Sequence, residues 1–256
     1  MTVRAKRTAT VIRKQALSPH FIRIVLGGSG LADFPEGFEG GYIKLVLPPQ
    51  AGSEKPCLRS YTIRDYSLEA CELTVDFACH GEGDELQGPA SQWAATVAQG
   101  DTVTIDGPGA VQRLDAQADW VLIAGDMTAL PAISVNLEHL PSQAKGYAVI
   151  EVLSEDDKVE IPCPEQVELH WVVNPLPAQP NTCLADAVKA LPWLPGTPSI
   201  WLASEFETMR NLRRYYKQEK SVDRQSLYVS SYWKMGETDE GNKAAKKRDA
   251  EAEAEI

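Results

Sequence analysis

The sequence predicts a two-domain protein in which an antiparallel β-barrel is followed by an open α/β domain with a parallel sheet. Its 256 residues suffice for two ordinary domains, and 43% of them are hydrophobic, which supplies both cores. Short strands separated by turn residues fill positions 1–113, a pattern typical of a barrel. From Ala118 onward, apolar strands alternate with helices, which is typical of a parallel sheet covered on both faces.

The first domain, 1–113, is expected to be built mainly from strands. We predict them at about 7–14, 20–27, 41–48, 58–64, 71–79 and 101–106. The segment GPASQWAATVAQG at 88–100 interrupts this pattern. Its spacing places Trp93, Ala94 and Val97 on one side of a helix.

The second domain, 114–240, is expected to contain five buried strands. They are WVLIAG (120–125), YAVIEVL (147–153), ELHWVV (168–173), SIWLAS (199–204) and SLYVSSYW (226–233). The charged segment that follows, 241–256, has almost nothing to bury. We expect a solvated helix or a disordered tail there.

Two helices of this domain have recognisable beginnings. Thr128 is a candidate N-cap for a helix whose apolar positions are Leu130, Ile133, Leu137 and Leu140. Ser204 and Glu207 have the spacing of a capping box. The helix that they would begin is expected to bury Phe206, Met209, Leu212 and Tyr216.

Composition narrows the possible partners. A net charge of −11 argues against a nucleic acid or an anionic membrane reached through the field of the whole molecule. The basic start of the chain lacks an apolar signal region, and no run of 18 apolar residues occurs, so we expect a cytoplasmic protein without membrane insertion. The five cysteines form no C-x-x-C pair, which favours buried thiols over disulfides or a metal site.

The strand PCLRSYTIRD at 56–65 has an unusual alternation. Arg59 and Tyr61 share one face, while Ser60 and Thr62 share the other. The strand therefore offers an aromatic plane, a fixed positive charge and a hydroxyl group. A barrel strand with an outward-reaching arginine and a core tyrosine explains the same pattern.

Three further segments join this strand in resembling one family. With VDFACHGEGDELQGPASQWA (75–94), AGDMTALPAI (124–133) and SSYWKMGETDE (230–240), the sequence resembles the siderophore-interacting proteins, FAD-dependent ferric-siderophore reductases of the ferredoxin-reductase-like superfamily. The likeness spans most of 1–240. It implies that the barrel binds FAD non-covalently and that the α/β domain binds NADPH or NADH.

The resemblance assigns roles to residues of the first domain. Arg59 would neutralise phosphate, Tyr61 would pack against the flavin, and Thr62 would act catalytically by hydrogen bonding near flavin N5. Further expected FAD contacts are Ser60, Asp76, His80, Gly88, Pro89, Ala90, Ser91 and Trp93. The GPAS turn also suits a pyrophosphate on physical grounds, because it leads into a helix N-terminus. A barrel-end histidine and a helix-core tryptophan are the alternatives for His80 and Trp93.

The nicotinamide site is predicted from position, since no G-x-G-x-x-G occurs. The segment AGDMTALP ends the first parallel strand, where an open sheet binds its ligand. The resemblance puts four of its residues beside the nicotinamide and the flavin: Asp126, Thr128, Ala129 and Pro131. Glu205 would face the same crevice as a second catalytic residue, or would only stabilise the start of a helix.

The remaining assignments concern charge and the end of the chain. Arg213 and Arg214 could bind the extra phosphate of NADPH, or lie on a solvated helix face. The resemblance implies that a C-terminal aromatic, Trp233 or Tyr232, covers the flavin. An anionic ferric siderophore needs local cations. The candidates are Lys44, Lys55, Arg64 and Lys234.

The resemblance therefore implies an NAD(P)H-dependent ferric-siderophore reductase that releases Fe(II), and we expect no resident metal site. A reductase of ferredoxin or flavin with the same fold, and a non-catalytic siderophore carrier, are the alternatives. A ferredoxin is also an alternative electron donor.

Overall fold

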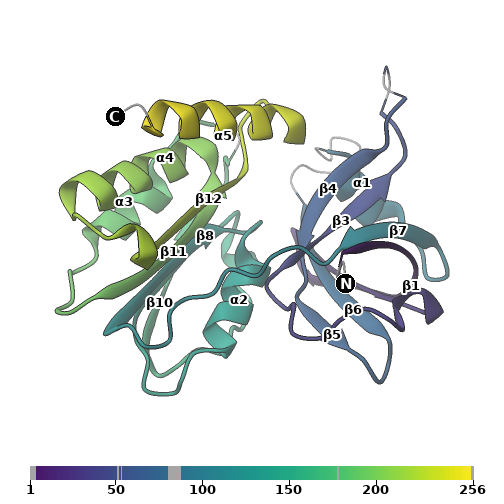
Figure 1. Cartoon of the computed structure of the whole chain (residues 1–256), viewed down its shortest axis with the longest axis horizontal. Coiled ribbons are helices and arrows are strands. Elements are labelled where there is room, and N and C mark those ends of the chain that lie inside the picture. The colour runs from purple at the N-terminus through teal and green to yellow at the C-terminus, as the bar shows by residue number, and fades with distance from the viewer. Residues whose placement is uncertain (1–3, 51, 53, 80–87, 178, 255–256) are drawn as a thin grey trace. The chain divides into compact units, whose positions relative to one another are not determined.

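The computed structural model describes residues 4–50, 52, 54–79, 88–177 and 179–254 (Figure 1). The chain divides into two compact units. Unit 1 comprises Met1–Gln112 and Asp156–Glu160, and unit 2 comprises Arg113–Glu155 and Ile161–Ile256. An antiparallel sheet forms unit 1 and a parallel sheet forms unit 2, in the predicted order.

In its described part, unit 1 contains one seven-stranded antiparallel sheet, ordered β4-β3-β7-β1-β2-β6-β5. The strands are β1 (Ala5–Ser18), β2 (Phe21–Gly27), β3 (Tyr42–Leu47), β4 (Cys57–Thr62), β5 (Asp65–Ser67), β6 (Glu72–Ala78) and β7 (Thr102–Gly107). Strand β5 was not predicted, because three residues are too few to show an alternation. The sheet curls into a half-barrel whose edge strands are β4 and β5.

One side of this sheet is the core of unit 1. Its centre consists of side chains with no measurable exposure, among them Ile24, Ile43, Leu45, Leu73 and Ile105. Helix α1 (Pro89–Thr96) packs against it through Ala90 and Ala94. The short 3-10 turn η1 (Ser29–Leu31) adds Leu31.

Unit 2 contains, over its described residues, a five-stranded parallel sheet ordered β10-β9-β8-β11-β12. Its strands are β8 (Trp120–Asp126), β9 (Lys145–Val152), β10 (Gln166–Val173), β11 (Pro198–Glu205) and β12 (Leu227–Trp233). After β8 the chain adds β9 and β10 on one side of that strand, and then β11 and β12 on its other side. The order therefore reverses between β8 and β11, which is where open sheets place a ligand crevice.

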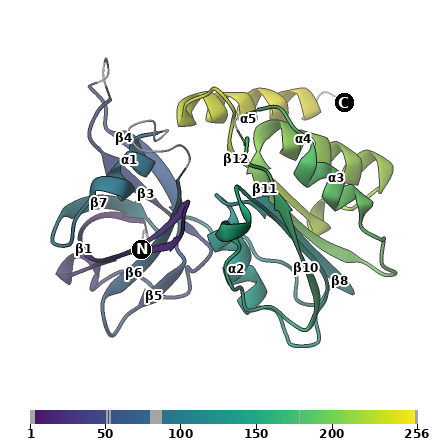
Figure 2. The same cartoon turned by 180° about the vertical axis from the view of Figure 1, so that it is seen from behind.

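Helices cover both faces of this sheet (Figures 1 and 2). Helix α2 (Leu130–Glu138) packs on the face that includes Gly125, where an added Cβ would meet Ala129 and Ile133. Helices α3 (Cys183–Ala190) and α4 (Phe206–Arg214) pack on the opposite face. The apolar positions predicted for α4 are all buried, namely Phe206, Met209, Leu212 and Tyr216.

Both predicted N-caps are wrong. Helix α2 begins after Ala129 without a side-chain cap, and the cap of α4 is Glu205, one residue later than expected. The hydroxyl groups of Thr128 and Ser204 instead donate to Asp126 at 2.5 and 2.8 Å. The hydroxyl groups that the sequence predicted to cap the two helices therefore bond to the buried Asp126 carboxylate instead.

The charged end of the chain forms helix α5 (Asp239–Ala254), one of the two predicted alternatives. The expectation that it buries almost nothing is wrong at Asn242 and Ala245, which are 4% and 5% exposed. The Ser231 hydroxyl lies 2.8 Å from Asn242 Oδ1, and Lys246 donates to the Ser231 carbonyl at 3.0 Å. Polar contacts with β12 therefore hold a helix that has little apolar surface.

The five cysteines are free thiols with unequal exposure. Cys57 and Cys79 are buried, Cys71 and Cys163 are partly exposed, and Cys183 is exposed at the start of α3. The expectation of buried thiols is therefore wrong for Cys183.

A short excursion between β9 and β10, Asp156–Glu160, belongs to unit 1. Its anchor is Asp157, which is fully buried. One carboxylate oxygen accepts from the Ser18 hydroxyl at 2.7 Å and the His20 backbone N–H at 3.0 Å, and the other lies 2.8 Å from His20 Nδ1. The segments before and after Arg113–Glu155 therefore both belong to unit 1.

We predict that Asp157→Ala destabilises the protein by about 2–3 kcal/mol, because donors at Ser18 and His20 lose their acceptor. The free energy of unfolding from urea titration measures this. Asp156→Ala, a change at the neighbouring exposed acid, is the control and should stay within about 0.5 kcal/mol of wild type. Equal midpoints for the two variants would contradict the anchor.

Candidate functional site

Three aromatic side chains bring β4, β6 and α1 together in unit 1. The ring centroid of Tyr61 lies 4.2 Å from that of Phe77, and the Phe77 centroid lies 5.6 Å from that of Trp93. Tyr61 and Trp93 remain partly exposed, whereas Phe77 is fully buried. Burial raises the pKa of the Tyr61 phenol, so the phenol stays neutral at physiological pH.

Polar groups lie next to this aromatic cluster along β4. Thr62 ends β4 and is 8% exposed. Ser60 is exposed and lies opposite Lys44 of β3. The Arg59 guanidinium is partly buried and donates to the Leu58 carbonyl at 3.0 Å.

The start of α1 has the features of an anion site. Gly88 has a φ of 93°, and an added Cβ there would meet no described atom within 4 Å. The helical ladder begins with Gln92 N–H donating to the Gly88 carbonyl at 3.1 Å, so the N–H groups of Ala90 and Ser91 precede it. Such N–H groups, at the positive end of the helix dipole, favour a phosphate.

Together these residues fit FAD in type. The aromatic cluster offers an apolar surface for a planar ring, Thr62 offers a hydroxyl, and the start of α1 suits a pyrophosphate. His80 lies outside the described residues. The specific FAD contacts stay predictions.

Asp76 is already engaged within the sheet. Both of its carboxylate oxygens accept hydrogen bonds from Arg23 of β2, each at 2.7 Å, and the carboxylate is almost fully buried. Arg23 and Asp76 are direct neighbours across the two strands. This pair explains an acid in a buried strand without a ligand, and contact between Asp76 and FAD remains a prediction.

Asp126 is the centre of the candidate site in unit 2. It ends β8 beside the point where the strand order reverses, and it is 7% exposed. One oxygen, Oδ1, accepts from the Thr128 N–H at 2.9 Å and from the Thr128 hydroxyl at 2.5 Å. The other, Oδ2, accepts from the Ser204 hydroxyl at 2.8 Å and from Trp233 Nε1 at 2.7 Å. Three predicted site residues, Asp126, Thr128 and Trp233, therefore meet here.

A second buried acid, Glu151, lies opposite Asp126 in the register of β8 and β9. Its Oε1 accepts from Asn174 Nδ2 at 3.1 Å. Burial raises the pKa of Glu151 to about 7, and the negative charge of Asp126 adds to that effect. The sequence analysis missed this residue, although a glutamate inside the apolar strand YAVIEVL was a visible signal.

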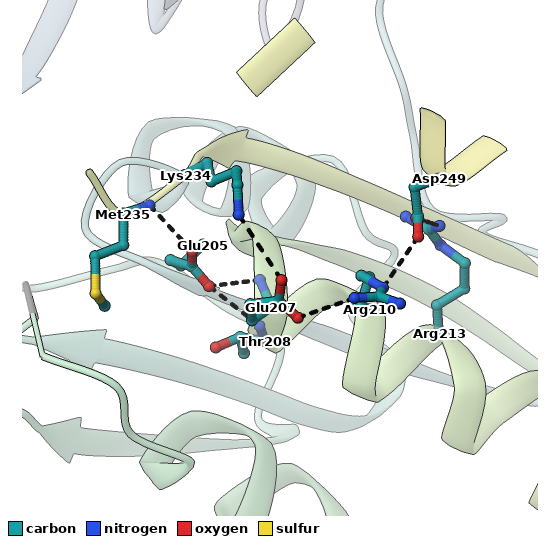
Figure 3. A network of polar contacts seen from close by, with 8 residues as sticks. All are labelled: Glu205, Glu207, Thr208, Arg210, Arg213, Lys234, Met235 and Asp249. Carbon is teal, nitrogen blue, oxygen red and sulfur yellow. Dashed lines mark hydrogen bonds and ion pairs between the residues drawn. The ribbon is translucent and has the colours of Figure 1, made fainter. Parts of the chain in front are cut away.

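The network around Glu205 joins the start of α4 to the end of β12 (Figure 3). Glu205 Oε2 accepts from the backbone N–H groups of Glu207 and Thr208 at 2.5 and 3.3 Å, and Oε1 accepts from the Met235 N–H at 3.2 Å. These bonds support the helix-start interpretation of Glu205. A catalytic role for it stays a prediction.

Two arginines of α4 pair with an acid of the C-terminal helix. Asp249 of α5 pairs with Arg210 at 3.0 Å and with Arg213 at 2.5 Å (Figure 3). Arg214 is exposed. An NADPH phosphate at Arg213 would therefore compete with Asp249.

The cations predicted to bind substrate lie in different surroundings. Lys234 is 3.8 Å from a Glu207 carboxylate oxygen and 4.7 Å from the centroid of the Phe206 ring. Lys44 lies opposite Asp106 of β7. Lys55 is exposed and Arg64 partly exposed.

Among the residues that the structure describes, no group of three or more histidine, cysteine, aspartate or glutamate side chains could hold a metal ion. Nor is any described helix long and apolar enough to cross a membrane.

Comparison with known proteins gives a consistent result. Residues 118–236 match the siderophore-interacting protein family, and residues 10–55 and 50–112 match the siderophore-interacting FAD-binding domain. The chain is 37% identical over 252 residues to the ferric vibriobactin reductase ViuB of Vibrio cholerae, covering 91% of each protein.

Solved structures agree. The siderophore-interacting protein SipS from Aeromonas hydrophila superposes with a TM-score of 0.84 and 34% identity, over 97% of this chain and 99% of that one. The ferredoxin-NADP+ reductase of Plasmodium falciparum superposes with a TM-score of 0.61 at 12% identity, over 89% of this chain and 96% of that one. The latter likeness concerns the fold alone and confirms the predicted ferredoxin-reductase-like class.

The buried Glu151 predicts a pH dependence of stability. Its pKa is 4.5 for an unperturbed carboxyl and about 7 in the folded protein, so the folded state holds a proton that the unfolded state releases. Stability should therefore fall as pH rises from about 4.5 to 7, by on the order of 3 kcal/mol. Glu151→Gln, which mimics the protonated acid, should lose this dependence.

The measurement is urea unfolding of both proteins at intervals from pH 5 to pH 8. The advantage of the glutamine variant should grow with pH across this window and then level off. A constant difference between the two proteins would show that Glu151 titrates alike in the folded and unfolded states.

Proposed function

Because the chain belongs to the siderophore-interacting protein family, we propose that it is an FAD-containing reductase that uses NAD(P)H to reduce ferric siderophores in the cytoplasm. The observation that carries the proposal is the grouping in unit 1 of the Tyr61–Phe77–Trp93 aromatic cluster, the Thr62 hydroxyl and the start of α1. Each part matches a different portion of one dinucleotide. The release of Fe(II) completes the proposed activity.

A bound FAD would supply the conversion of one two-electron donation into one-electron transfers to Fe(III). The residues of the chain would bind the FAD and orient it. Tyr61 and its aromatic neighbours provide surface for the planar ring, and the Thr62 hydroxyl lies beside them for a hydrogen bond. Arg59 and the free N–H groups at the start of α1 neutralise the pyrophosphate.

The nicotinamide donor is assigned to the carboxyl end of the parallel sheet in unit 2. The turn from Asp126 to Thr128 leads there into α2, which begins with Leu130 and Pro131. Arg214 is the exposed cation that would bind the 2′-phosphate of NADPH, since Arg213 pairs with Asp249. The proposal therefore includes NADPH and NADH, with a ferredoxin as the alternative donor.

The iron is substrate in this proposal. Fe(II) binds hard, anionic oxygen ligands less tightly than Fe(III), so reduction loosens the siderophore's hold on the metal. An anionic chelate must approach a chain of net charge −11, which requires local cations. Lys44, Lys55, Arg64 and Lys234 are assigned that role.

Two other functions fit the same fold. A ferredoxin or flavin reductase would pass electrons to a protein or a second flavin, and a carrier would bind the siderophore without turnover. Anaerobic mixing of the FAD-loaded protein with NADPH or NADH distinguishes them. Loss of the flavin absorbance band followed by its return on adding ferric siderophore supports the reductase. No loss of the band with either donor contradicts it.

We predict that Arg59→Ala weakens FAD binding roughly ten- to a hundredfold, because one charge-assisted contact to phosphate is lost. Flavin fluorescence titration of the apoprotein measures the affinity. Arg13→Ala is the matched control, since Arg13 lies in the same sheet and pairs with Glu72 on the surface. Equal FAD affinities for the two variants would remove Arg59 from the site.

We also predict that salt weakens capture of an anionic ferric siderophore, because exposed charges are screened over about 8 Å at physiological ionic strength. Lys55→Ala with Lys234→Ala should lower the affinity and flatten its salt dependence. Lys145→Ala with Lys247→Ala changes the net charge equally at exposed positions and is the control. A double variant at 55 and 234 with the wild-type salt slope would exclude this basic site.

A further inference from the structure

The carboxylate of Asp126 is saturated by the protein. A carboxylate offers about four acceptor positions, and four donors occupy them: the Thr128 N–H, the Thr128 hydroxyl, the Ser204 hydroxyl and the Trp233 indole N–H. The contacts span 2.5–2.9 Å, and the residue is 7% exposed. A ligand that bound this carboxylate would have to displace one of these donors.

Trp233 reaches Asp126 across a strand. It ends β12, Asp126 ends β8, and β11 lies between them in the sheet. The pairing register of β11 and β12 shifts between Ser204 and Glu205, so that Glu205 pairs with Trp233. A shift of this kind re-aims the side chain that follows it. The indole therefore extends over the carboxyl end of β11, at the reversal point of the sheet.

We propose that Asp126 is a positioning residue, which holds the Trp233 indole as a stacking surface for the nicotinamide ring of the donor and does not contact that donor itself. The indole is partly exposed, so part of the ring is accessible to a planar partner. This role rests on the proposed function, because it assumes that NADH or NADPH binds at this end of the sheet. This positioning role takes the place of the direct contact between Asp126 and the nicotinamide that the resemblance implied.

The position requires a carboxylate. Two of its donors are N–H groups, which cannot become acceptors, and they bond to different oxygens. An asparagine has one acceptor oxygen, so Asp126→Asn places its amide NH2 against the Thr128 N–H or against the Trp233 N–H in either orientation. In a Trp233→Phe background this conflict disappears, because the NH2 can face the Ser204 hydroxyl, which then accepts.

The first measurement is the indole 15N–1H NMR spectrum of the FAD-loaded protein. Six tryptophans give six signals, and the signal lost in Trp233→Phe identifies residue 233. In wild type its N–H should exchange slowly with water and resonate downfield because it donates to a carboxylate. In Asp126→Asn it should shift upfield and exchange faster, while the other five signals report that the fold is intact.

The second measurement is the affinity for NADP+ and NAD+, which bind without reducing the flavin. Asp126→Asn and Trp233→Phe should each weaken the binding of the preferred dinucleotide by roughly two- to tenfold, the range of one aromatic contact. The double variant should be no weaker than either single variant, because both changes remove one unit. Asp119→Asn is the matched control at the other end of β8, where the carboxylate accepts from the Thr197 N–H at 2.7 Å.

Each other outcome has a defined meaning. If Asp126→Asn weakens binding equally in the wild-type and Trp233→Phe backgrounds, Asp126 contacts the donor directly and the inference is overturned. Unchanged affinity in Trp233→Phe overturns it as well. A wild type that binds neither dinucleotide overturns the proposed function and this role together, whereas binding without coupling between the two positions overturns this role alone.

Discussion

The buried negative charge of Asp126 is the constraint on which unit 2 depends. An ionised carboxylate removed from water must be surrounded by donors, and here they come from the first turn after β8, from β11 and from β12. One side chain thereby ties together three strand ends and the approach to α2. Glu151 lies opposite it in the register of β8 and β9, and burial raises the pKa of Glu151 to about 7, so neutral pH can remove its proton.

Much of the fold could be predicted from the sequence because apolar periodicity depends only on neighbours along the chain. The strands of both sheets except the short β5, and the buried face of α4, follow that pattern. The helix beginnings could not be predicted in the same way. Thr128 and Ser204 have the right residue types for caps, but their hydroxyls donate to Asp126, in the second case 78 positions away. For Ser204, a tertiary contact outweighed a local preference.

The candidate site shows the same division. The motifs led to residues that meet in space, such as Tyr61 with Trp93 through Phe77, and Asp126 with Thr128 and Trp233. What they did not predict was how far some of these groups are already engaged. Asp76 is paired with Arg23, and Arg213 with an acid of α5. Ion pairs between distant segments leave no periodic signal in the sequence. A charged residue that binds a ligand therefore cannot be distinguished there from one that pairs with another side chain.

The excursion at Asp156–Glu160 affects how this architecture can be divided. Because unit 1 contains that segment as well as Met1–Gln112, the chain passes between the units three times, at 112–113, 155–156 and 160–161. A fragment ending at the first passage would lack Asp157 and leave Ser18 and His20 without their acceptor. Cutting the chain at 112–113 therefore does not yield two complete units that could be exchanged between proteins. A chimaera that joins Met1–Gln112 to a foreign second domain would have to carry the short segment Asp156–Glu160 as well.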